Sequence, residues 1–179
     1  MIRFDSMPPE VMQAMCTPMH QILSPPPGSI AGSLYVGSLS AVQDKEMLLE
    51  HRISHLVQVL DAPWLPQLSE KDGFNCYPIQ ILDQASVDLK PHLEAACNHI
   101  DRALRSGKNV LVHCQQGISR SPAIVIAYLI RNHGMSYDNA YALLKRKRAC
   151  IKPNSGFVAA LREWEGDWRR PAAARRFTS

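Results

Sequence analysis

The chain contains 179 residues, of which 46% are hydrophobic and 20% charged, and its formal net charge is +4. This length suits one domain with a full hydrophobic core. No apolar run approaches the roughly 20 residues that a membrane-spanning helix needs, so the composition predicts a soluble globular protein and no association with a membrane.

The cysteines are spread widely and include no C-x-x-C pair: Cys16, Cys76, Cys97, Cys114 and Cys150. An odd number at such spacings argues against a disulfide framework and against a structural zinc site. The pairs His51/His55 and His92/His99 lack a third ligand, so we expect no metal and no cofactor. No signal-peptide pattern is visible at the N-terminus. We therefore predict a reducing compartment, cytoplasmic and/or nuclear.

Residues 1–28 are rich in Met and Pro and close with a triple proline. A short helix is predicted between Pro9 and Leu23, interrupted at Pro18, and the prolines predict a stiff extended connector. We interpret residues 1–28 as an arm outside the main domain, which spans residues 29–170. The apolar side chains of the arm either pack back on that domain or form a stripe for a partner.

Strand and helix patterns alternate along residues 29–170. The predicted strands are 30–37, 55–60, 74–81 and 109–113, and the predicted helices are 40–52, 89–106, 121–133, 137–149 and 156–169. Ser40 is expected to cap the first of these helices, and Leu49 to lie on its buried face. Trp64, which lies between prolines, is interpreted as a loop-packing anchor, or alternatively as part of a groove. The alternation predicts an α/β fold with a central, mostly parallel sheet flanked by helices.

The C-terminal part of the chain is basic. Residues 145–179 hold ten Lys or Arg against three acidic residues, a net charge of +7, which leaves −3 for the first 144 residues. We interpret this end as a solvated helix face followed by a basic tail at residues 171–179. The alternatives are a docking surface for an acidic or phosphorylated partner and a nuclear-localisation signal at Lys145–Arg148.

The stretch Val110–Pro122 carries the clearest chemistry. An apolar strand leads into a glycine-containing loop, and the loop leads into a long helix pattern. The N–H groups of such a loop and of the first helical turn converge on one point and bind anions. Cys114 opens the loop, where those donors favour a thiolate, and Arg120 closes it with a planar fork that suits phosphoryl oxygens. A nucleophile beside an oxyanion cradle predicts phosphoryl transfer through a cysteinyl-phosphate.

The run His113-Cys114, five residues, then Arg120 resembles the signature of the protein tyrosine phosphatase superfamily, and Ser119–Ala123 resembles its dual-specificity branch, as a small atypical member. The resemblance covers roughly residues 29–168 and implies the cysteine-dependent phosphatase fold. It also implies that a phosphate contacts the loop residues, which are Gln115, Gln116, Gly117, Ile118, Ser119 and Arg120. By the same resemblance, Ser121 helps the thiolate leave during hydrolysis. We expect His113 to be buried and to order the loop through a hydrogen bond.

Expelling an alcohol or phenol oxygen from phosphorus requires a proton donor. Asp83 and Asp88 are the candidates. Asp83 directly follows a predicted strand, and Ile79–Asp83 resembles the general-acid segment of the superfamily. We assign the general acid to Asp83, whereas Asp88 suits the N-terminus of the next helix. The segment Asn154–Phe157 also matches a motif of the family, and we interpret it as a structural helix start.

The loop residues between Cys114 and Arg120 are uncharged, whereas phosphoinositide phosphatases of the superfamily usually carry Lys there. The resemblance therefore favours a protein phosphatase acting on phosphotyrosine and phosphoserine/phosphothreonine. A phosphoprotein is the expected partner, and nucleic acid is not expected. The alternatives are a phosphatase of another monoester (lipid, RNA 5′ end or sugar) and a catalytically silent phospho-binding module. The joint presence of Cys114, Arg120 and Asp83 argues against the second alternative.

Overall fold

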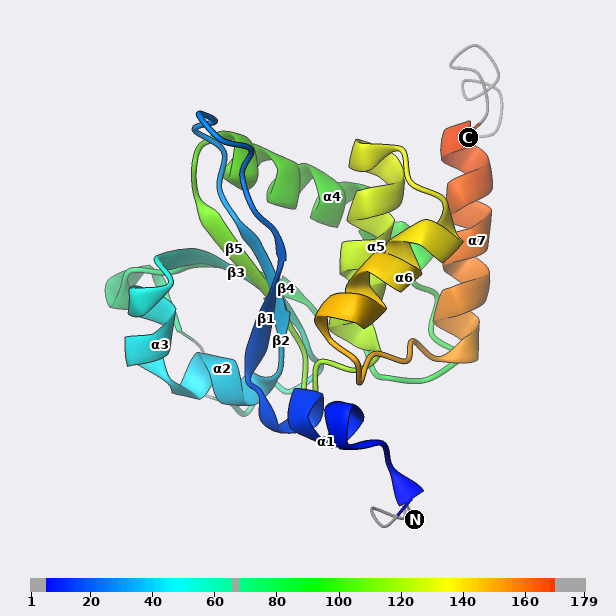
Figure 1. Ribbon diagram of the computed structural model, residues 1–179, viewed down its shortest axis with the longest axis horizontal. Coiled ribbons are helices and arrows are strands. Elements are labelled where there is room, and N and C mark those ends of the chain that lie inside the picture. Colours follow the sequence, from blue (N-terminus) through cyan, green and yellow to red (C-terminus); the bar gives the residue numbers. More distant parts are fainter. Residues whose placement is uncertain (1–5, 66–67, 170–179) are drawn as a thin grey trace.

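Five strands form one sheet at the centre of the computed structural model, which describes residues 6–65 and 68–169 (Figure 1). The strands are β1 (Met19–Leu23), β2 (Leu34–Gly37), β3 (Ile53–Val59), β4 (Asn75–Ile79) and β5 (Asn109–His113). Their order across the sheet is β1-β2-β5-β3-β4, and only β1 runs antiparallel to its neighbour. The predicted α/β fold with a mostly parallel sheet is confirmed.

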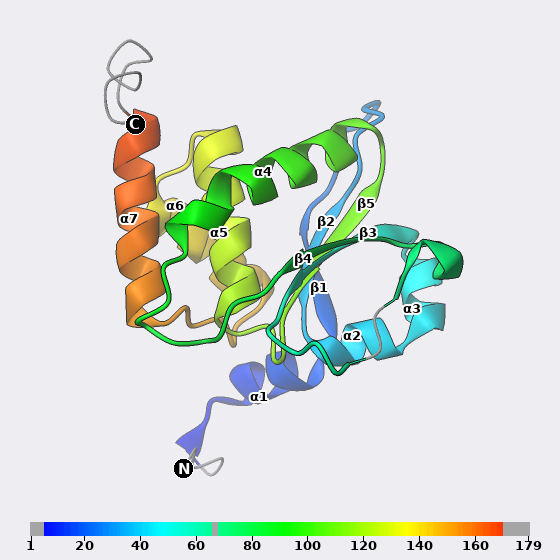
Figure 2. The ribbon, with the colours of Figure 1, turned by 180° about the vertical axis from the view of Figure 1, so that it is seen from behind.

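Helices cover both faces of this sheet. They are α1 (Pro9–Cys16), α2 (Leu39–Gln43), α3 (Lys45–Glu50), α4 (Lys90–Arg105), α5 (Arg120–His133), α6 (Tyr137–Lys147) and α7 (Ser155–Arg169), and a short 3₁₀ turn, η2, spans Glu70–Asp72. The α2–α3 pair lies on one face and α4 to α7 lie on the other (Figures 1 and 2). Among the described residues, no helix has the length and apolar character that crossing a membrane requires.

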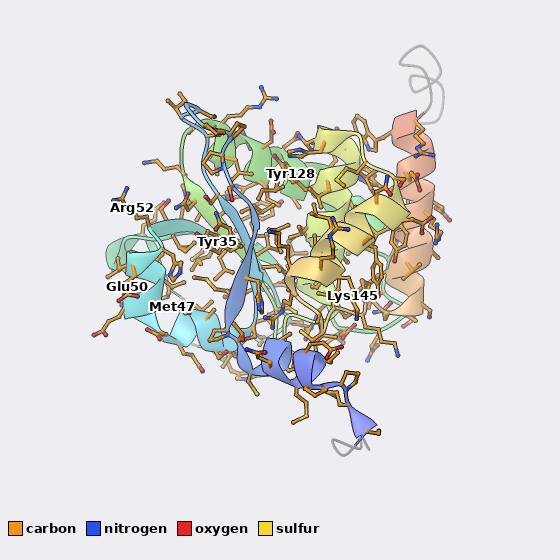
Figure 3. The ribbon with its side chains drawn as sticks, viewed as in Figure 1. Tyr35, Met47, Glu50, Arg52, Tyr128 and Lys145 are labelled. Atoms are coloured by element: carbon orange, nitrogen blue, oxygen red, sulfur yellow. The ribbon has the colours of Figure 1, made fainter. Side chains whose placement is uncertain are left out.

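The central strand β5 is buried on both faces because a core lies on each side of it. Val110 and Val112 belong to the core beneath α4 and α5, whereas Leu111 belongs to the core beneath α2 and α3. This alternation follows from the two-residue period of a strand, and it explains why the three middle residues of β5, Val110, Leu111 and Val112, are all apolar. Tyr35 on β2 and Tyr128 on α5 mark the two opposite faces (Figure 3).

The prediction of one helix over residues 40–52, capped by Ser40, is wrong. The chain forms two short helices, and Asp44 between them accepts a hydrogen bond from the Met47 N–H at 3.0 Å, which caps α3. Ser40 lies inside α2 and pairs with the Ser38 hydroxyl instead. Leu49 is 65% exposed rather than buried. The single helical pattern concealed the break because Asp44 is both a helix end and a helix cap.

The boundary predicted at residue 28 also needs correction. Helix α1 ends before Pro18, as predicted, but the following β1 pairs with β2, from Met19↔Gly37 to Leu23↔Leu34. The triple proline lies in the connection between these two strands rather than between two domains. Residues 19–23 are therefore an edge strand of the sheet, and the predicted separation of residues 1–28 does not hold for them. The tail predicted at residues 171–179 lies outside the described residues.

Candidate active site

The signature loop, defined here as residues 114–120, leaves the sheet at the carboxyl ends of its parallel strands. His113 is opposite Gly37 of β2 and Gln58 of β3, so β2, β3 and β5 end at the same edge. This is the edge at which open α/β sheets bind ligands. Cys114 is the first residue beyond β5, and it is only 2% exposed.

All five carbonyls between Cys114 and Arg120 accept hydrogen bonds from groups outside the loop. The donors are the Leu39 N–H to Gln115 (3.1 Å), Arg148 to Gln116 (3.0 Å) and to Gly117 (2.9 Å), the Lys152 N–H to Ile118 (2.7 Å), and the Ala123 N–H to Ser119 (3.1 Å). In a trans peptide the C=O and the following N–H point in opposite directions. The N–H groups of residues 116–120 are therefore turned to the inside of the loop, which makes it an anion cradle.

Gly117 makes the tight curvature of the loop possible. Its φ is +66°, which favours glycine. A Cβ atom at this position would lie 2.6 Å from the Gly37 carbonyl oxygen and 2.8 Å from Nη2 of Arg148. Any larger residue would therefore push the loop away from β2 and from Arg148.

The sulfur of Cys114 accepts two hydrogen bonds. The Gly117 N–H and the Ser121 hydroxyl each lie 3.2 Å from Sγ. Ser121 is completely buried at the start of α5, and its hydroxyl is also 3.3 Å from the Gly37 carbonyl. Two donors stabilise negative charge on the sulfur, so the position of Ser121 suits the role predicted for it.

Arg120 has an unused donor beside the loop in the described part of the chain. Its Nη1 donates to the Ile81 carbonyl at 3.2 Å, whereas its buried Nε has no partner among the described residues. A buried guanidinium N–H without an acceptor is costly unless a ligand or water satisfies it. An oxyanion bound in the loop would supply that acceptor.

Asp83 is tied directly to the signature loop. Its Oδ1 accepts from the Ser119 hydroxyl at 2.7 Å and from the Asn154 side-chain amide at 2.9 Å. Both bonds end on Oδ1, which leaves Oδ2 for a substrate. Asp88 instead accepts from the Lys90 N–H in the first turn of α4. The structure thus brings together Asp83, and not Asp88, with the loop.

Asn154 is a site residue that the sequence interpretation missed. Its Oδ1 accepts from the Phe157 N–H at 2.9 Å, and Phe157 is fully buried, which fits the predicted helix start. The same side chain also holds Asp83, and its backbone N–H donates to the Ser119 hydroxyl at 3.0 Å. Asn154 therefore links α7, the acid-bearing loop and the signature loop.

His113 is fully buried, as predicted, and its ring interacts with the signature loop through the backbone of Cys114. This interaction is weak, because neither ring nitrogen has a hydrogen bond of good distance and angle among the described residues. Burial lowers the pKa of His113 to about 4, and the backbone of Cys114 offsets only part of this effect. The imidazole is therefore neutral at pH 7 and unsuited to act as a general base there.

This burial makes stability depend on pH. Above pH 6.5, His113 is neutral in both the folded and the unfolded chain. Below it, the unfolded chain binds the proton first, so stability falls as the pH drops from 6.5 towards 4. The shift corresponds to about 3 kcal/mol in the free energy of unfolding. In urea denaturation between pH 6.5 and 4, the free energy of unfolding should fall more steeply with decreasing pH for the wild type than for His113→Leu. Equal losses would contradict the assignment.

Two other sequence interpretations need correction. Trp64 is 77% exposed, so it is not a loop-packing anchor. Within Lys145–Arg148, the predicted docking or localisation surface, Arg148 is completely buried and Lys145 donates to the Ile151 carbonyl at 3.0 Å. Only Arg146 and Lys147 of this run are exposed. In Figure 3, Lys145 lies on the α6 side of the molecule.

Comparison with known proteins identifies relatives of this chain. A family model described as the dual specificity phosphatase catalytic domain matches residues 34–167. Dual specificity protein phosphatase 1B of Arabidopsis thaliana is 36% identical over 138 residues, which cover 76% of this chain and 80% of the relative.

Solved structures show the same fold. The crystal structure of human DUSP28 has a TM-score of 0.76 and 28% identity, covering 86% of this chain and 97% of that one. The human tyrosine phosphatase-like serine/threonine/tyrosine-interacting protein has a TM-score of 0.73 and 33% identity, covering 83% and 95% respectively. The range matched by the family model, residues 34–167, contains both Asp83 and the signature loop.

Proposed function

The chain belongs to the dual specificity phosphatase family, and from this premise we propose that it hydrolyses phosphotyrosine and phosphoserine/phosphothreonine in proteins through a cysteinyl-phosphate on Cys114. Membership of this family makes the chain a cysteine-dependent protein phosphatase. The cysteinyl-phosphate intermediate and the three phosphorylated residue types are what we propose in addition. The observation that supports it most is the outward orientation of the loop carbonyls, which points the N–H groups of residues 116–120 inward around Cys114.

The first step transfers the phosphoryl group to the enzyme. The Cys114 thiolate attacks phosphorus, an S–P bond forms, and the bond from phosphorus to the substrate oxygen breaks. Asp83 gives its proton to the departing oxygen. The inward N–H groups and Arg120 hold the phosphoryl oxygens, whose charge they match best in the transition state.

The second step releases phosphate. A water molecule attacks phosphorus, the ionised Asp83 accepts a proton from it, and the S–P bond breaks with its electron pair returning to sulfur. The Ser121 hydroxyl, 3.2 Å from Sγ, donates to the sulfur as it becomes negative. Asp83 and Cys114 end the cycle in the protonation states in which they began it.

The character of the surface beside the signature loop favours a peptide as the substrate. A hollow of about 330 Å³ adjoins Gln115 and Gln116 and has an uncharged lining, completed by Met15, Ser38, Leu39, Ser40 and Gln43. Glutamine and serine side chains can hydrogen-bond a peptide backbone. No cation in this lining would meet a second phosphate, as a polyphosphorylated headgroup would require.

The test is phosphate release by the full-length protein from matched substrates at one pH. The panel contains phosphotyrosine, phosphoserine and phosphothreonine peptides, a phosphoinositide, a 5′-phosphorylated RNA and a sugar phosphate. We expect the phosphopeptides to give the highest kcat/KM. A higher value for a lipid, RNA or sugar would support the non-protein alternative. Phosphopeptide binding without any hydrolysis would support a silent binding module.

A further inference from the structure

Arg148 is a charged side chain buried directly behind the signature loop. It is completely buried, and it makes four hydrogen bonds through its guanidinium. Nε donates to the Gly117 carbonyl at 2.9 Å and Nη2 to the Gln116 carbonyl at 3.0 Å, while Nη1 donates to the Thr17 carbonyl at 2.7 Å and lies 2.9 Å from Nδ1 of His20. A buried charge is tolerated only with such partners.

One end of the guanidinium determines how two consecutive peptide units are oriented. By accepting from Arg148, the carbonyls of Gln116 and Gly117 are held outward, so the N–H groups of Gly117 and Ile118 point inward. The Gly117 N–H is the one that contacts Sγ of Cys114 at 3.2 Å. The planar fork of Arg matches this pair of carbonyls, which the point charge of Lys cannot do.

The other end of the guanidinium contacts the N-terminal segment. Thr17 follows α1, and His20 lies in β1. Both belong to residues 1–28, which the sequence pattern predicts to lie outside the main domain. The antiparallel pairing of β1 with β2 fixes their position, and the Pro18 carbonyl accepts from the Ser38 N–H at 2.9 Å. Since Nη1 is a donor, Nδ1 of His20 must accept, which requires a neutral imidazole.

We infer that Arg148 is a positioning residue of the signature loop, and that the segment Thr17–His20 belongs to the catalytic unit because it holds the far end of the Arg148 guanidinium. This inference rests on the proposed function of the loop. It assigns to the N-terminal segment a role in catalysis without any contact between that segment and substrate. Without Arg148, or without the Thr17–His20 segment that holds it, the peptide units that follow Gln116 and Gly117 could rotate. Their N–H groups would then turn away from the sulfur and the phosphoryl group.

The experiment compares Arg148→Lys, Arg148→Met and His20→Leu with the wild type. For each, kcat and KM on an aryl phosphate are measured, together with the rate at which iodoacetate alkylates Cys114 as a function of pH. We expect kcat to fall by roughly 10–100-fold for the Arg148 variants, by analogy with the loss that follows removal of residues that orient metal-binding side chains. Their alkylation profile should move to higher pH. His20→Leu should change both quantities in the same direction by less.

Arg105→Met is the matched control, because the Arg105 side chain is 80% exposed and forms an ion pair with Asp101 on its own helix. It should match the wild type in both measurements. Should the Arg148 variants fail to fold, as melting curves would show, His20→Leu decides the question. The inference would be overturned if every folded Arg148 and His20 variant kept the wild-type kcat and alkylation profile. It would also be overturned if Arg105→Met lost as much kcat as the Arg148 variants. Alkylation requires no turnover, so a wild type without phosphatase activity would refute the proposed function and still leave this inference testable.

Discussion

Replacing Cys114 by serine is expected to lower kcat on the order of 10⁴-fold or more, as removal of a catalytic nucleophile does in other hydrolases. The hydroxyl is a much weaker nucleophile than a thiolate that accepts two hydrogen bonds, from Gly117 and Ser121. The cradle remains, because the loop carbonyls keep their outer partners. The Kd of a phosphotyrosine peptide, measured by fluorescence anisotropy, should therefore change by less than about tenfold, or about 1.4 kcal/mol.

Cys97→Ala serves as the control for this variant. Cys97 lies on the buried face of α4, where burial raises the pKa of its thiol to about 12, so the thiol is neutral and unreactive at pH 7. The kcat of Cys97→Ala should stay close to that of the wild type. Comparable turnover by Cys114→Ser and the wild type would mean that Cys114 is not the nucleophile.

Asp83→Asn is expected to show a loss of activity that depends on the leaving group. The variant keeps the nucleophile and the cradle but cannot donate a proton. An alkyl oxygen such as that of phosphoserine leaves poorly without one, so kcat/KM should fall by roughly 10²–10⁴-fold. An activated aryl phosphate needs little protonation and should lose much less. The substituted amide can still accept at Oδ1 from Ser119 and Asn154, so the loop should stay in place.

Asp88→Asn is the matched control, since the Asp88 carboxylate accepts a hydrogen bond from the Lys90 N–H at the start of α4 rather than from the signature loop. It should leave both substrates nearly unaffected. If Asp88→Asn showed the leaving-group dependence and Asp83→Asn did not, the general acid would be Asp88. If neither did, the proton would come from another source.

The central part of the site could be predicted because it is local in sequence. Strand β5 covers residues 109–113, as predicted, and α5 begins at Arg120, one residue before the predicted start. Strand, loop and helix are contiguous, so the pattern of apolar residues, Gly117 and the Cys114–Arg120 spacing describes them without knowledge of the rest of the chain. The position of Asp83 beside the loop could be predicted for a different reason, because Asp83 follows a strand of the same parallel sheet and the carboxyl ends of such strands share one edge.

The supporting residues could not be predicted, because their partners are distant in sequence. Arg148 donates to Thr17 across 131 positions, and Asn154 donates to Asp83 across 71. In the sequence, Arg148 is one of four consecutive basic residues and looks as exposed as Arg146 and Lys147. Its burial depends on how α6 packs beside β1, and β1 itself is a five-residue strand with a mixed pattern that gives little signal.

The most direct test of the cysteinyl-phosphate is to find it. Turnover of a phosphopeptide by the full-length protein would be stopped in acid within milliseconds, and the peptides of the enzyme would be analysed by mass spectrometry. We expect phosphate on Cys114, at a higher level in Asp83→Asn with an aryl phosphate, because that variant forms the intermediate but hydrolyses it slowly. Phosphate on another residue, or continued turnover without any phosphate on Cys114, would contradict the mechanism.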